Sequence, residues 1–374
     1  MKVLTVVGTR PEIIRLAETI KVLDASFDHV FVHTGQNYDY ELNQVFFNDL
    51  GLRKPDYFLS AARDQPISTV AAILMEMDPL LKREKPDAFL VLGDTNSALS
   101  AYVAKRQHIP IFHVEAGNRS FDFRVPEEIN RRIVDCISDV NLTYSEHARR
   151  HLLAEGFPAD RIIKVGSPMA EVIAKQAEAI ANSSILAELG LSESQYILAS
   201  AHREENVDAP DRLKSLVACF EALTSAMNVD VIMSLHPRTA KRIESCGLKL
   251  GPRIRTHKPF GFTDYLALQK SAACVVSDSG SITEEASLLG IPAVTIRQAH
   301  ERPEGMDAGV LVMADLEPSR VVDAVNIAIA QHREFGPAQR VPDYDVEQVS
   351  WKIAKIIASY TDYVKREVWK EGLA

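Results

Sequence analysis

The sequence has few cysteines and no long apolar segment. Its four cysteines are widely separated, so no Cys-x-x-Cys pair is available for zinc or for redox exchange. The longest uncharged stretches reach only eleven residues, whereas a membrane-spanning helix needs about 18 or more. The dinucleotide glycine fingerprint, the P-loop, the Gly-x-Ser-x-Gly elbow and the His-Glu-x-x-His pair are also absent. We therefore expect no membrane span, no bound metal and no serine-hydrolase chemistry.

Cationic charge is also in short supply. The chain has 42 lysines and arginines against 51 acidic residues, a formal net charge of −9. Such a chain repels a long phosphate backbone, so we expect no nucleic-acid partner. A small anionic substrate stays open, because a few well-placed cations can bind it. The first residues reach Gly8 and Arg10 too soon for a secretory signal, and we expect a cytoplasmic protein.

What the sequence does contain is an alternation of short β-branched runs and longer amphipathic stretches, which predicts an α/β fold with mostly parallel sheets. The chain has 374 residues, enough for two hydrophobic cores. The pattern of strands stops near residue 168 and restarts at residue 196. We predict two similar domains, residues 1–170 and 171–345, followed by a helix within 346–374 that packs across the domain junction, back on the first domain. The predicted strands are 3–7, 29–33, 88–92, 110–114, 140–144 and 162–165, then 196–200, 231–234, 254–256, 274–277, 293–296 and 310–312.

Ligands of open α/β sheets bind beyond the carboxyl ends of the strands, so the residues that follow each strand are the informative ones. After the first predicted strand, Arg10 opens a helix whose free amides favour an anion. Asp94 and Glu115 each follow a later strand and place two carboxylates at one sheet edge. Each acid could instead cap a helix or bind a local amide. The adjacent Glu127 and Glu128, which open a helix after a proline, have the same two interpretations.

The second series of strands supplies groups suited to phosphate. His202 and His236 follow successive strands, each beside an arginine. The run Ser279-Gly280-Ser281 forms a turn of small residues into a helix, which can present backbone amides to a phosphate. A lone histidine at a strand end is more often structural, but two at successive ends favour a phosphate site.

Seven short motifs occur in order along the chain, namely GTRPE, GDTNS, HVEAGNRS, PEEINR, AHREEN, SDSGSITEE and ERPE. As an ordered set they resemble the non-hydrolysing UDP-N-acetylglucosamine 2-epimerase family. The resemblance implies two Rossmann-like domains that face a central cleft, in the arrangement called glycosyltransferase-B-like, with UDP held mainly by the second. It also implies a homodimer that supplies surface polysaccharide precursors and needs no cofactor. In the implied reaction, the UDP-sugar loses UDP to form a 2-acetamidoglycal. UDP is then added back, and the configuration at carbon 2 is inverted.

The same resemblance assigns roles to individual residues. Carbon 2 carries a weakly acidic proton, so the reaction needs carboxylates for proton transfer and donors for the departing diphosphate. The implied catalytic residues are Asp94, Glu115, Glu127 and His202. The implied substrate-binding residues are Arg10, His236, Ser279, Gly280 and Ser281 at the diphosphate, Glu285 at the ribose, and Phe262 and Tyr265 at the uracil.

Some positions depart from the family pattern. Asn37 stands where a histidine is expected, Ser281 stands where glycine is more usual, and the loop from Arg119 to Pro126 is short. Asn37 and Asp39 lie in the region that many bacterial members use to bind an activating second UDP-sugar. These departures resemble the branch that converts UDP-2-acetamido-2,6-dideoxy-L-talose to UDP-N-acetyl-L-fucosamine, an alternative with the same reaction type.

Three other functions fit part of the pattern. A glycosyltransferase of the same architecture needs the same UDP contacts but also an acceptor groove. A UDP-sugar-binding module without turnover would explain the phosphate-binding features but not three acids after the first-domain strands. A hydrolysing epimerase that releases free N-acetylmannosamine is the third alternative.

Overall fold

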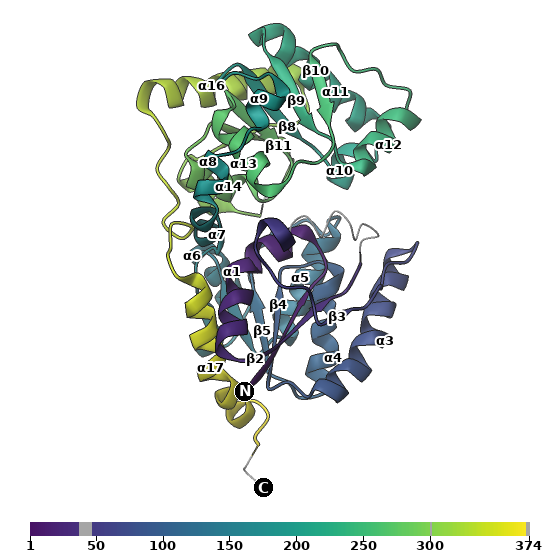
Figure 1. Cartoon of the computed structure of the whole chain (residues 1–374), viewed down its shortest axis with the longest axis vertical. Helices are drawn as coiled ribbons and strands as arrows, with labels where there is room; N and C mark the ends of the chain where they lie inside the picture. The colour runs from purple at the N-terminus through teal and green to yellow at the C-terminus, as the bar shows by residue number, and fades with distance from the viewer. Residues whose placement is uncertain (37–46, 300, 372–374) are drawn as a thin grey trace. The chain divides into compact units, whose positions relative to one another are not determined.

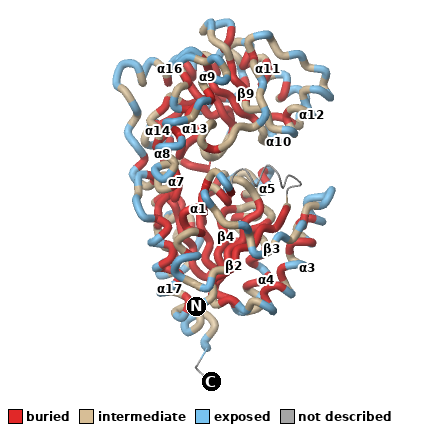
Figure 2. The backbone as a smooth tube through the Cα atoms, viewed as in Figure 1, coloured by how far each residue is buried: buried red, intermediate tan, exposed pale blue. Residues whose placement is uncertain are grey.

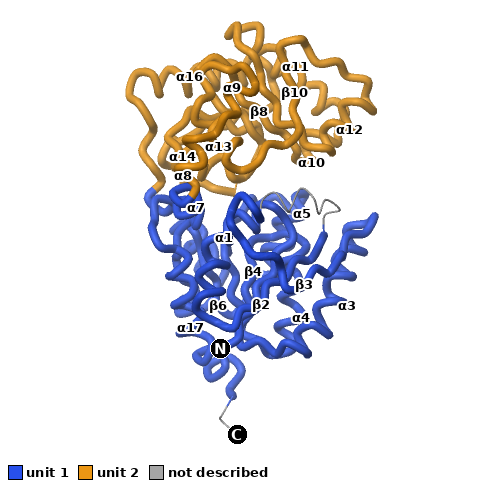
Figure 3. The backbone as a smooth tube through the Cα atoms, in the orientation of Figure 1, with its two compact units in different colours: residues 1–175, 342–374 blue, residues 176–341 orange. Residues whose placement is uncertain are grey.

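The computed structural model describes residues 1–36, 47–299 and 301–371, so Asn37 and Asp39 lie outside the described residues. The chain divides into two compact units, one of residues 1–175 and 342–374 and the other of residues 176–341 (Figure 3). The chain passes from the first unit to the second after residue 175, five residues beyond the predicted division at residue 170. The chain returns to the first unit after residue 341, four residues before the predicted boundary at 345.

The first unit is built on a seven-stranded parallel sheet with the order β3-β2-β1-β4-β5-β6-β7 (Figure 1). Its strands are β1 (Lys2–Val7), β2 (Asp28–His33), β3 (Tyr57–Phe58), β4 (Ala88–Leu92), β5 (Ile111–Val114), β6 (Val140–Thr143) and β7 (Ile162–Lys164). All five residues of β4 are buried, as expected for a strand covered by helices on both faces. Figure 2 shows the buried strands at the centre of the unit.

Helices cover the first sheet, and their starts follow from the sequence. Proline occupies the first turn of α1 and α5, where its missing N–H costs no hydrogen bond. The described helices of this unit are α1 (Arg10–Ser26), α3 (Pro66–Glu84), α4 (Ala101–Arg106), α5 (Pro126–Ile137), α6 (Glu146–Ala154), α7 (Met169–Lys175) and α17 (Val349–Glu367), with short 3-10 turns at η1 (Asn96–Ser100) and η2 (Ala159–Arg161). The C-terminal helix α17 packs against α1.

The second unit repeats the architecture with a six-stranded parallel sheet of order β10-β9-β8-β11-β12-β13. Its strands are β8 (Tyr196–Ser200), β9 (Asp230–Ser234), β10 (Ile254–His257), β11 (Cys274–Ser277), β12 (Ala293–Thr295) and β13 (Val312–Met313). Its helices are α8 (Ala177–Ala181), α9 (Ile185–Leu189), α10 (Glu204–Val207), α11 (Pro210–Met227), α12 (Pro237–Ser245), α13 (Phe262–Ser271), α14 (Ile282–Leu289), α15 (Pro303–Asp307) and α16 (Pro318–Phe335). The predicted α/β class with two sheets is therefore confirmed.

Both sheets reverse their strand order at one place. In the first sheet β1 lies beside β4, and in the second β8 lies beside β11, although each pair is separated in the chain by two other strands. Parallel α/β sheets bind ligands beyond the carboxyl ends of the strands at such a reversal of strand order. The residues after β1, β4, β8 and β11 are therefore the ones to inspect first.

Among the described residues, no helix is long and apolar enough to cross a lipid bilayer.

The sequence predicted each described strand except β3, which was missed. That strand has only two residues and joins the edge of the first sheet through Val32 and His33 of β2. Two residues give no detectable periodicity.

Candidate active site

A buried glutamate, Glu12, organises the turn after β1. Oε2 of Glu12 accepts hydrogen bonds from the N–H groups of Gly8 (2.8 Å) and Thr9 (2.7 Å), while its Oε1 accepts one from the Thr95 hydroxyl (2.9 Å) after β4. Burial raises the pKa of Glu12 to about 7, against the lowering effect of these bonds. Glu12 therefore ties the two central loops of the first sheet together.

Close packing explains the glycine in this turn. A Cβ atom on Gly8 would lie 1.9 Å from the hydroxyl oxygen of Ser97 and 2.3 Å from that of Thr34. Only glycine lets the turn approach the loop after β4 this closely. Arg10 follows as the first residue of α1 and is half-buried, so the helix terminus at the carboxyl edge carries a cation.

Asp94 lies directly after β4 and Gly93, at the carboxyl edge of the first sheet. Its Oδ2 accepts hydrogen bonds from Arg131, including one from Nε at 3.0 Å, and its backbone carbonyl accepts one from Asn130 (2.9 Å). The Asp94 side chain is 18% exposed, whereas that of Arg131 is 1% exposed. A buried arginine on α5 thus holds a carboxylate that keeps some access to solvent.

Glu115 follows the neighbouring strand, β5. It adopts a positive φ of 67°, a strained conformation for a residue with a side chain and one that often marks a functional site. Arg15 Nη1 lies 3.5 Å from one carboxylate oxygen, and the Asn118 amide donates to the other at 3.4 Å. Arg131 Nη1 also donates to the Asn118 carbonyl (3.2 Å). One connected network therefore contacts Asp94 and Glu115.

The structure separates the two adjacent glutamates at the start of α5. Glu128 is completely buried and accepts hydrogen bonds from the Ser120 N–H (2.9 Å), Arg131 (3.2 Å) and Arg132 (2.8 Å). Glu127 is only half-buried. Glu128 therefore has a structural role, since it anchors the short loop before α5. Glu127 remains the candidate for a functional role.

In the second unit, the loop after β8 is fixed by Asp278, which follows β11. The completely buried Asp278 carboxylate accepts hydrogen bonds from the N–H groups of His202 (3.1 Å) and Arg203 (3.0 Å) and from the Asn206 amide (3.2 Å). The ring Nδ1 of His202 lies 3.4 Å from the same carboxylate, and the side chain is 41% exposed. His202 is therefore presented to solvent from a rigid loop.

His236 joins His202 at the same sheet edge. It follows β9, and its ring centroid lies 5.9 Å from that of His202. Nδ1 of His236 accepts a hydrogen bond from the Arg238 N–H (3.2 Å) and so caps α12. This bond fixes the tautomer with the proton on Nε2, which leaves that nitrogen as a donor.

The turn Ser279-Gly280-Ser281 lies between β11 and α14. The Ser279 N–H donates to the Ser277 hydroxyl (3.0 Å), and the hydroxyls of Ser279 and Ser281 are 3.0 Å apart. A Cβ on Gly280 would lie 3.6 Å from Nη2 of Arg203, which places a guanidinium beside the turn. Hydroxyls and a cation thus gather where the sequence predicted only backbone amides.

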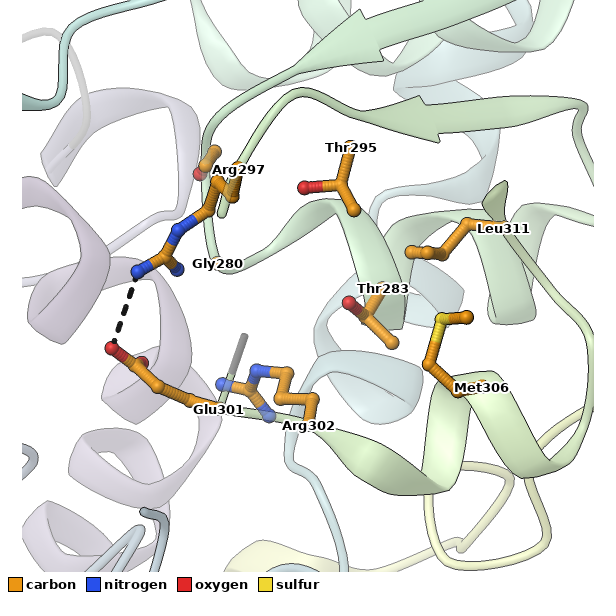
Figure 4. Close-up of a pocket in the computed structure, with 9 residues that line it drawn as sticks. Gly280, Thr283, Thr295, Arg297, Glu301, Arg302, Met306 and Leu311 are labelled. Atoms are coloured by element: carbon orange, nitrogen blue, oxygen red, sulfur yellow. Dashed lines mark ion pairs between the residues drawn. The ribbon is translucent and has the colours of Figure 1, made fainter. Parts of the chain in front are cut away.

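A pocket opens beside this turn, within the second unit (Figure 4). Two nearly buried arginines line it, Arg297 at 3% and Arg302 at 4% exposure. Arg297 lies 3.6 Å from a carboxylate oxygen of Glu301, the ion pair drawn in Figure 4, and Arg302 lies 3.0 Å from Glu284. The pocket therefore places two ion-paired arginines and Glu301 beside the small residues of the turn.

The three remaining predicted residues lie on α13 and α14. Glu285 is 7% exposed, and one of its oxygens accepts a hydrogen bond from the Gln269 amide (2.6 Å). Phe262 is only 5% exposed and offers little surface to a base. Tyr265 is half-buried and donates its hydroxyl to Ser200 (3.1 Å), and burial raises the pKa of its phenol to about 12.

Sequence reasoning missed the residues that hold Asp94 and His202 in place, which are Arg131 and Asp278. It also missed the two arginines that line the pocket, Arg297 and Arg302. All four lie in or near the quoted motifs. A buried aspartate directly after β11 could have been suspected from its likeness to Asp94 after β4.

The part of the chain that the structure describes contains no group of three or more His, Cys, Asp or Glu side chains that could hold a metal ion.

Comparison with known proteins places these observations in a family. Residues 21–358 match the family model described as UDP-N-acetylglucosamine 2-epimerase. The solved structure of UDP-N-acetylglucosamine 2-epimerase from Rickettsia bellii is 50% identical, covers 99% of this chain and 100% of its own, and superposes with a TM-score of 0.93.

Two further relatives differ in what their names specify. The Methanocaldococcus jannaschii UDP-GlcNAc 2-epimerase in complex with UDP-GlcNAc and UDP is 33% identical, with 96% of this chain and 99% of that chain covered and a TM-score of 0.90. The UDP-2,3-diacetamido-2,3-dideoxy-D-glucuronate 2-epimerase of Pseudomonas aeruginosa is 36% identical over 88% of this chain and 93% of its own. These relatives share an epimerisation at carbon 2 of a UDP-sugar, but their sugars differ.

Proposed function

Because the chain belongs to the UDP-N-acetylglucosamine 2-epimerase family, a family of isomerases, we propose that it converts UDP-N-acetylglucosamine to UDP-N-acetylmannosamine without hydrolysing it. In the proposed route, the carbon 2 proton is removed as the bond between carbon 1 and the UDP oxygen breaks, which gives a 2-acetamidoglycal and UDP. UDP then adds back at carbon 1 while a proton is delivered to the opposite face of carbon 2, which inverts carbon 2. The observation that carries the proposal is the pair of carboxylates, Asp94 and Glu115, joined through one buried arginine network after neighbouring strands.

Proton transfer is the task that we assign to the first unit. Inversion requires a group that removes the carbon 2 proton on one face of the sugar and a group that returns a proton on the other, so one carboxylate is not enough. Asp94, Glu115 and Glu127 provide the candidates. The contacts of Arg131 with Asp94 and of Arg15 with Glu115 hold two of them in fixed orientations, which reduces the reorganisation required during the reaction.

Stabilising the departing diphosphate is the task that we assign to the second unit, with Arg10 of the first. Negative charge grows on the leaving oxygen, and prearranged donors lower the barrier. His202 and His236 face one sheet edge, and the serine hydroxyls and Arg203 gather at the next turn. The pocket beside that turn adds two arginines, Arg297 and Arg302, each ion-paired to a neighbouring glutamate.

The identity of the sugar is the finer part of the proposal. The Pseudomonas relative named for a diacetamido glucuronate is 36% identical, and the UDP-N-acetylglucosamine 2-epimerase of Methanocaldococcus jannaschii is 35% identical in the same comparison. Identity at this level does not separate the two sugars, whose substituents are selected by a few pocket contacts. The 50% identical Rickettsia structure, named a UDP-N-acetylglucosamine 2-epimerase, supports N-acetylglucosamine as the first choice. UDP-2-acetamido-2,6-dideoxy-L-talose stays the alternative substrate. The homodimer, the cytoplasmic location and the supply of polysaccharide precursors stay predictions.

We expect the purified chain to convert at least one of UDP-N-acetylglucosamine and UDP-2-acetamido-2,6-dideoxy-L-talose to its carbon 2 epimer when no acceptor is present. Binding would not discriminate, because both sugars share every UDP contact, so turnover has to be compared. Proton NMR of each reaction mixture identifies the epimer. Release of free UDP together with a new glycoside, seen only after an acceptor is added, would support a glycosyltransferase instead. Accumulation of free N-acetylmannosamine would support a hydrolysing enzyme. Binding of the UDP-sugar without turnover would support a regulatory module.

A further inference from the structure

The two central strands of the second sheet end in serines that face each other. Ser200 is the last residue of β8 and Ser277 is the last residue of β11, and the two are paired in the strand register. Their hydroxyl oxygens lie 2.7 Å apart, and both residues are buried. His202 and Ser279 follow two residues later on their respective strands. The serine pair therefore lies where two of the loops assigned to the diphosphate leave the sheet.

Further hydrogen bonds continue from both serines. The Ser277 hydroxyl oxygen accepts a hydrogen bond from the N–H of Ser279 (3.0 Å), whose own hydroxyl lies 3.0 Å from that of Ser281. On the other side, the Tyr265 hydroxyl on α13 donates to Ser200 (3.1 Å). Because burial raises the pKa of Tyr265 to about 12, its phenol keeps the proton that this bond uses. A continuous chain of hydrogen bonds therefore runs from α13 to the turn after β11.

The direction of this hydrogen-bond chain follows from the groups in it. A backbone N–H can only donate, so Ser277 uses a lone pair for the bond from Ser279. Ser200 accepts from the tyrosine and can give its own proton to Ser277. All the bonds then form in one arrangement, and hydrogen bonds in such a chain strengthen one another. The chain is thus able to hold the turn in one shape.

Helix α13 also holds a second residue predicted to contact the substrate. Gln269 lies four residues after Tyr265, and its amide donates to Glu285 on α14 at 2.6 Å. Residues four apart lie on the same face of a helix. One face of α13 is therefore connected both to the carboxylate predicted to bind the ribose and, through the two serines, to the turn predicted to bind the diphosphate.

We propose that Tyr265, Ser200 and Ser277 are positioning residues, which hold the Ser279-Gly280-Ser281 turn in the shape that binds the diphosphate of UDP. The inference rests on the proposed function for one step, the binding of diphosphate at this turn. A turn that is held in place before binding loses less freedom when the ligand arrives, so the affinity is higher. The hydroxyl of Tyr265 thus has a role inside the protein, in place of the uracil contact predicted from the resemblance.

Titration calorimetry with UDP alone tests the proposal without any turnover. We expect the Kd for UDP to rise about tenfold in Ser277→Ala, which removes the acceptor next to the turn, and about threefold in Tyr265→Phe at the far end. These are the effects expected for the loss of one or two hydrogen bonds. An unchanged Kd in Ser277→Ala, with a normal unfolding curve, would overturn the proposal.

The double variant, Ser277→Ala with Tyr265→Phe, tests whether the hydrogen bonds act as one chain. If the tyrosine acts on the turn only through Ser277, its loss should add nothing once Ser277 has been replaced. We therefore expect the Kd to rise about tenfold, as in Ser277→Ala alone. A rise of about thirtyfold, the product of the two single effects, would show that the residues act independently and would contradict the chain.

The matched control is Tyr196→Phe. The Tyr196 hydroxyl also joins β8 to α13, because it donates to the Leu268 carbonyl (2.6 Å), but it lies on the first residue of β8, at the opposite edge of the sheet. We expect this variant to lower the free energy of unfolding and to keep the Kd for UDP. Equal weakening of UDP binding in both tyrosine variants would reduce the effect of Tyr265 to a general loss of stability and overturn its role.

The unaltered chain distinguishes failure of this inference from failure of the proposed function. Absence of UDP binding by the unaltered chain would contradict the proposed function, and the inference with it. Tight binding by the unaltered chain and by Ser277→Ala alike would contradict only the positioning role. Tight binding by the unaltered chain with the expected losses in the variants would support both.

Discussion

Replacing Asp94 with asparagine is expected to reduce kcat by about 10²- to 10⁴-fold, the usual contribution of a positioned acid or base. Asparagine has nearly the same shape and keeps one oxygen for the contact with Arg131, so the turn after β4 should be preserved. What it cannot do is exchange a proton with carbon 2. Initial rates of epimerisation, together with the denaturant midpoint, check this expectation.

Glu128→Gln provides the control, because Glu128 is hydrogen-bonded to the same Arg131 but is completely buried. Removing its charge should lower the free energy of unfolding, since Arg131 and Arg132 lose an ionised partner. It should leave kcat within a few-fold of the unaltered chain. If the two variants lost activity equally, the effect of Asp94 would come from the arginine network and not from proton transfer.

The second large effect is expected for His202→Ala. Loss of one donor at a developing negative charge commonly costs on the order of a hundredfold in rate. Stability should change little, because the side chain is 41% exposed and the Asp278 carboxylate binds the backbone N–H of residue 202, which alanine retains. Turnover measured beside a thermal unfolding curve tests this expectation.

A suitable control is His332→Ala, in the last turn of α16, a histidine outside the turns after β8, β9 and β11. It should keep full activity. Near-normal turnover of His202→Ala with a normal unfolding curve would make His202 a structural residue of its loop.

Most of the fold could be predicted because each strand is marked by its own short run of apolar residues. Strands such as β4 and β8 are short apolar runs whose residues are all buried, so the run itself marks the strand. Their carboxyl ends then point to the site, since parallel strands end at the same edge. β3 escaped because two residues at a sheet edge bury too little to leave a pattern.

The parts that could not be predicted depend on contacts between distant residues. Arg131 meets Asp94 across 37 positions of sequence, and the Asp278 carboxylate meets the His202 N–H across 76. Nothing local distinguishes Glu127 from Glu128, since only the direction of each side chain on α5 decides which one is buried.

The most direct test of the account is to run the reaction in deuterium oxide and follow carbon 2 of the UDP-sugar by proton NMR. Removal and return of the carbon 2 proton through side-chain carboxylates exposes it to exchange with solvent. We predict that every molecule of epimerised product carries deuterium at carbon 2 and that the Asp94→Asn variant incorporates deuterium at the same reduced rate at which it epimerises. Product that keeps protium at carbon 2 throughout would contradict the elimination route and the roles assigned to Asp94, Glu115 and Glu127.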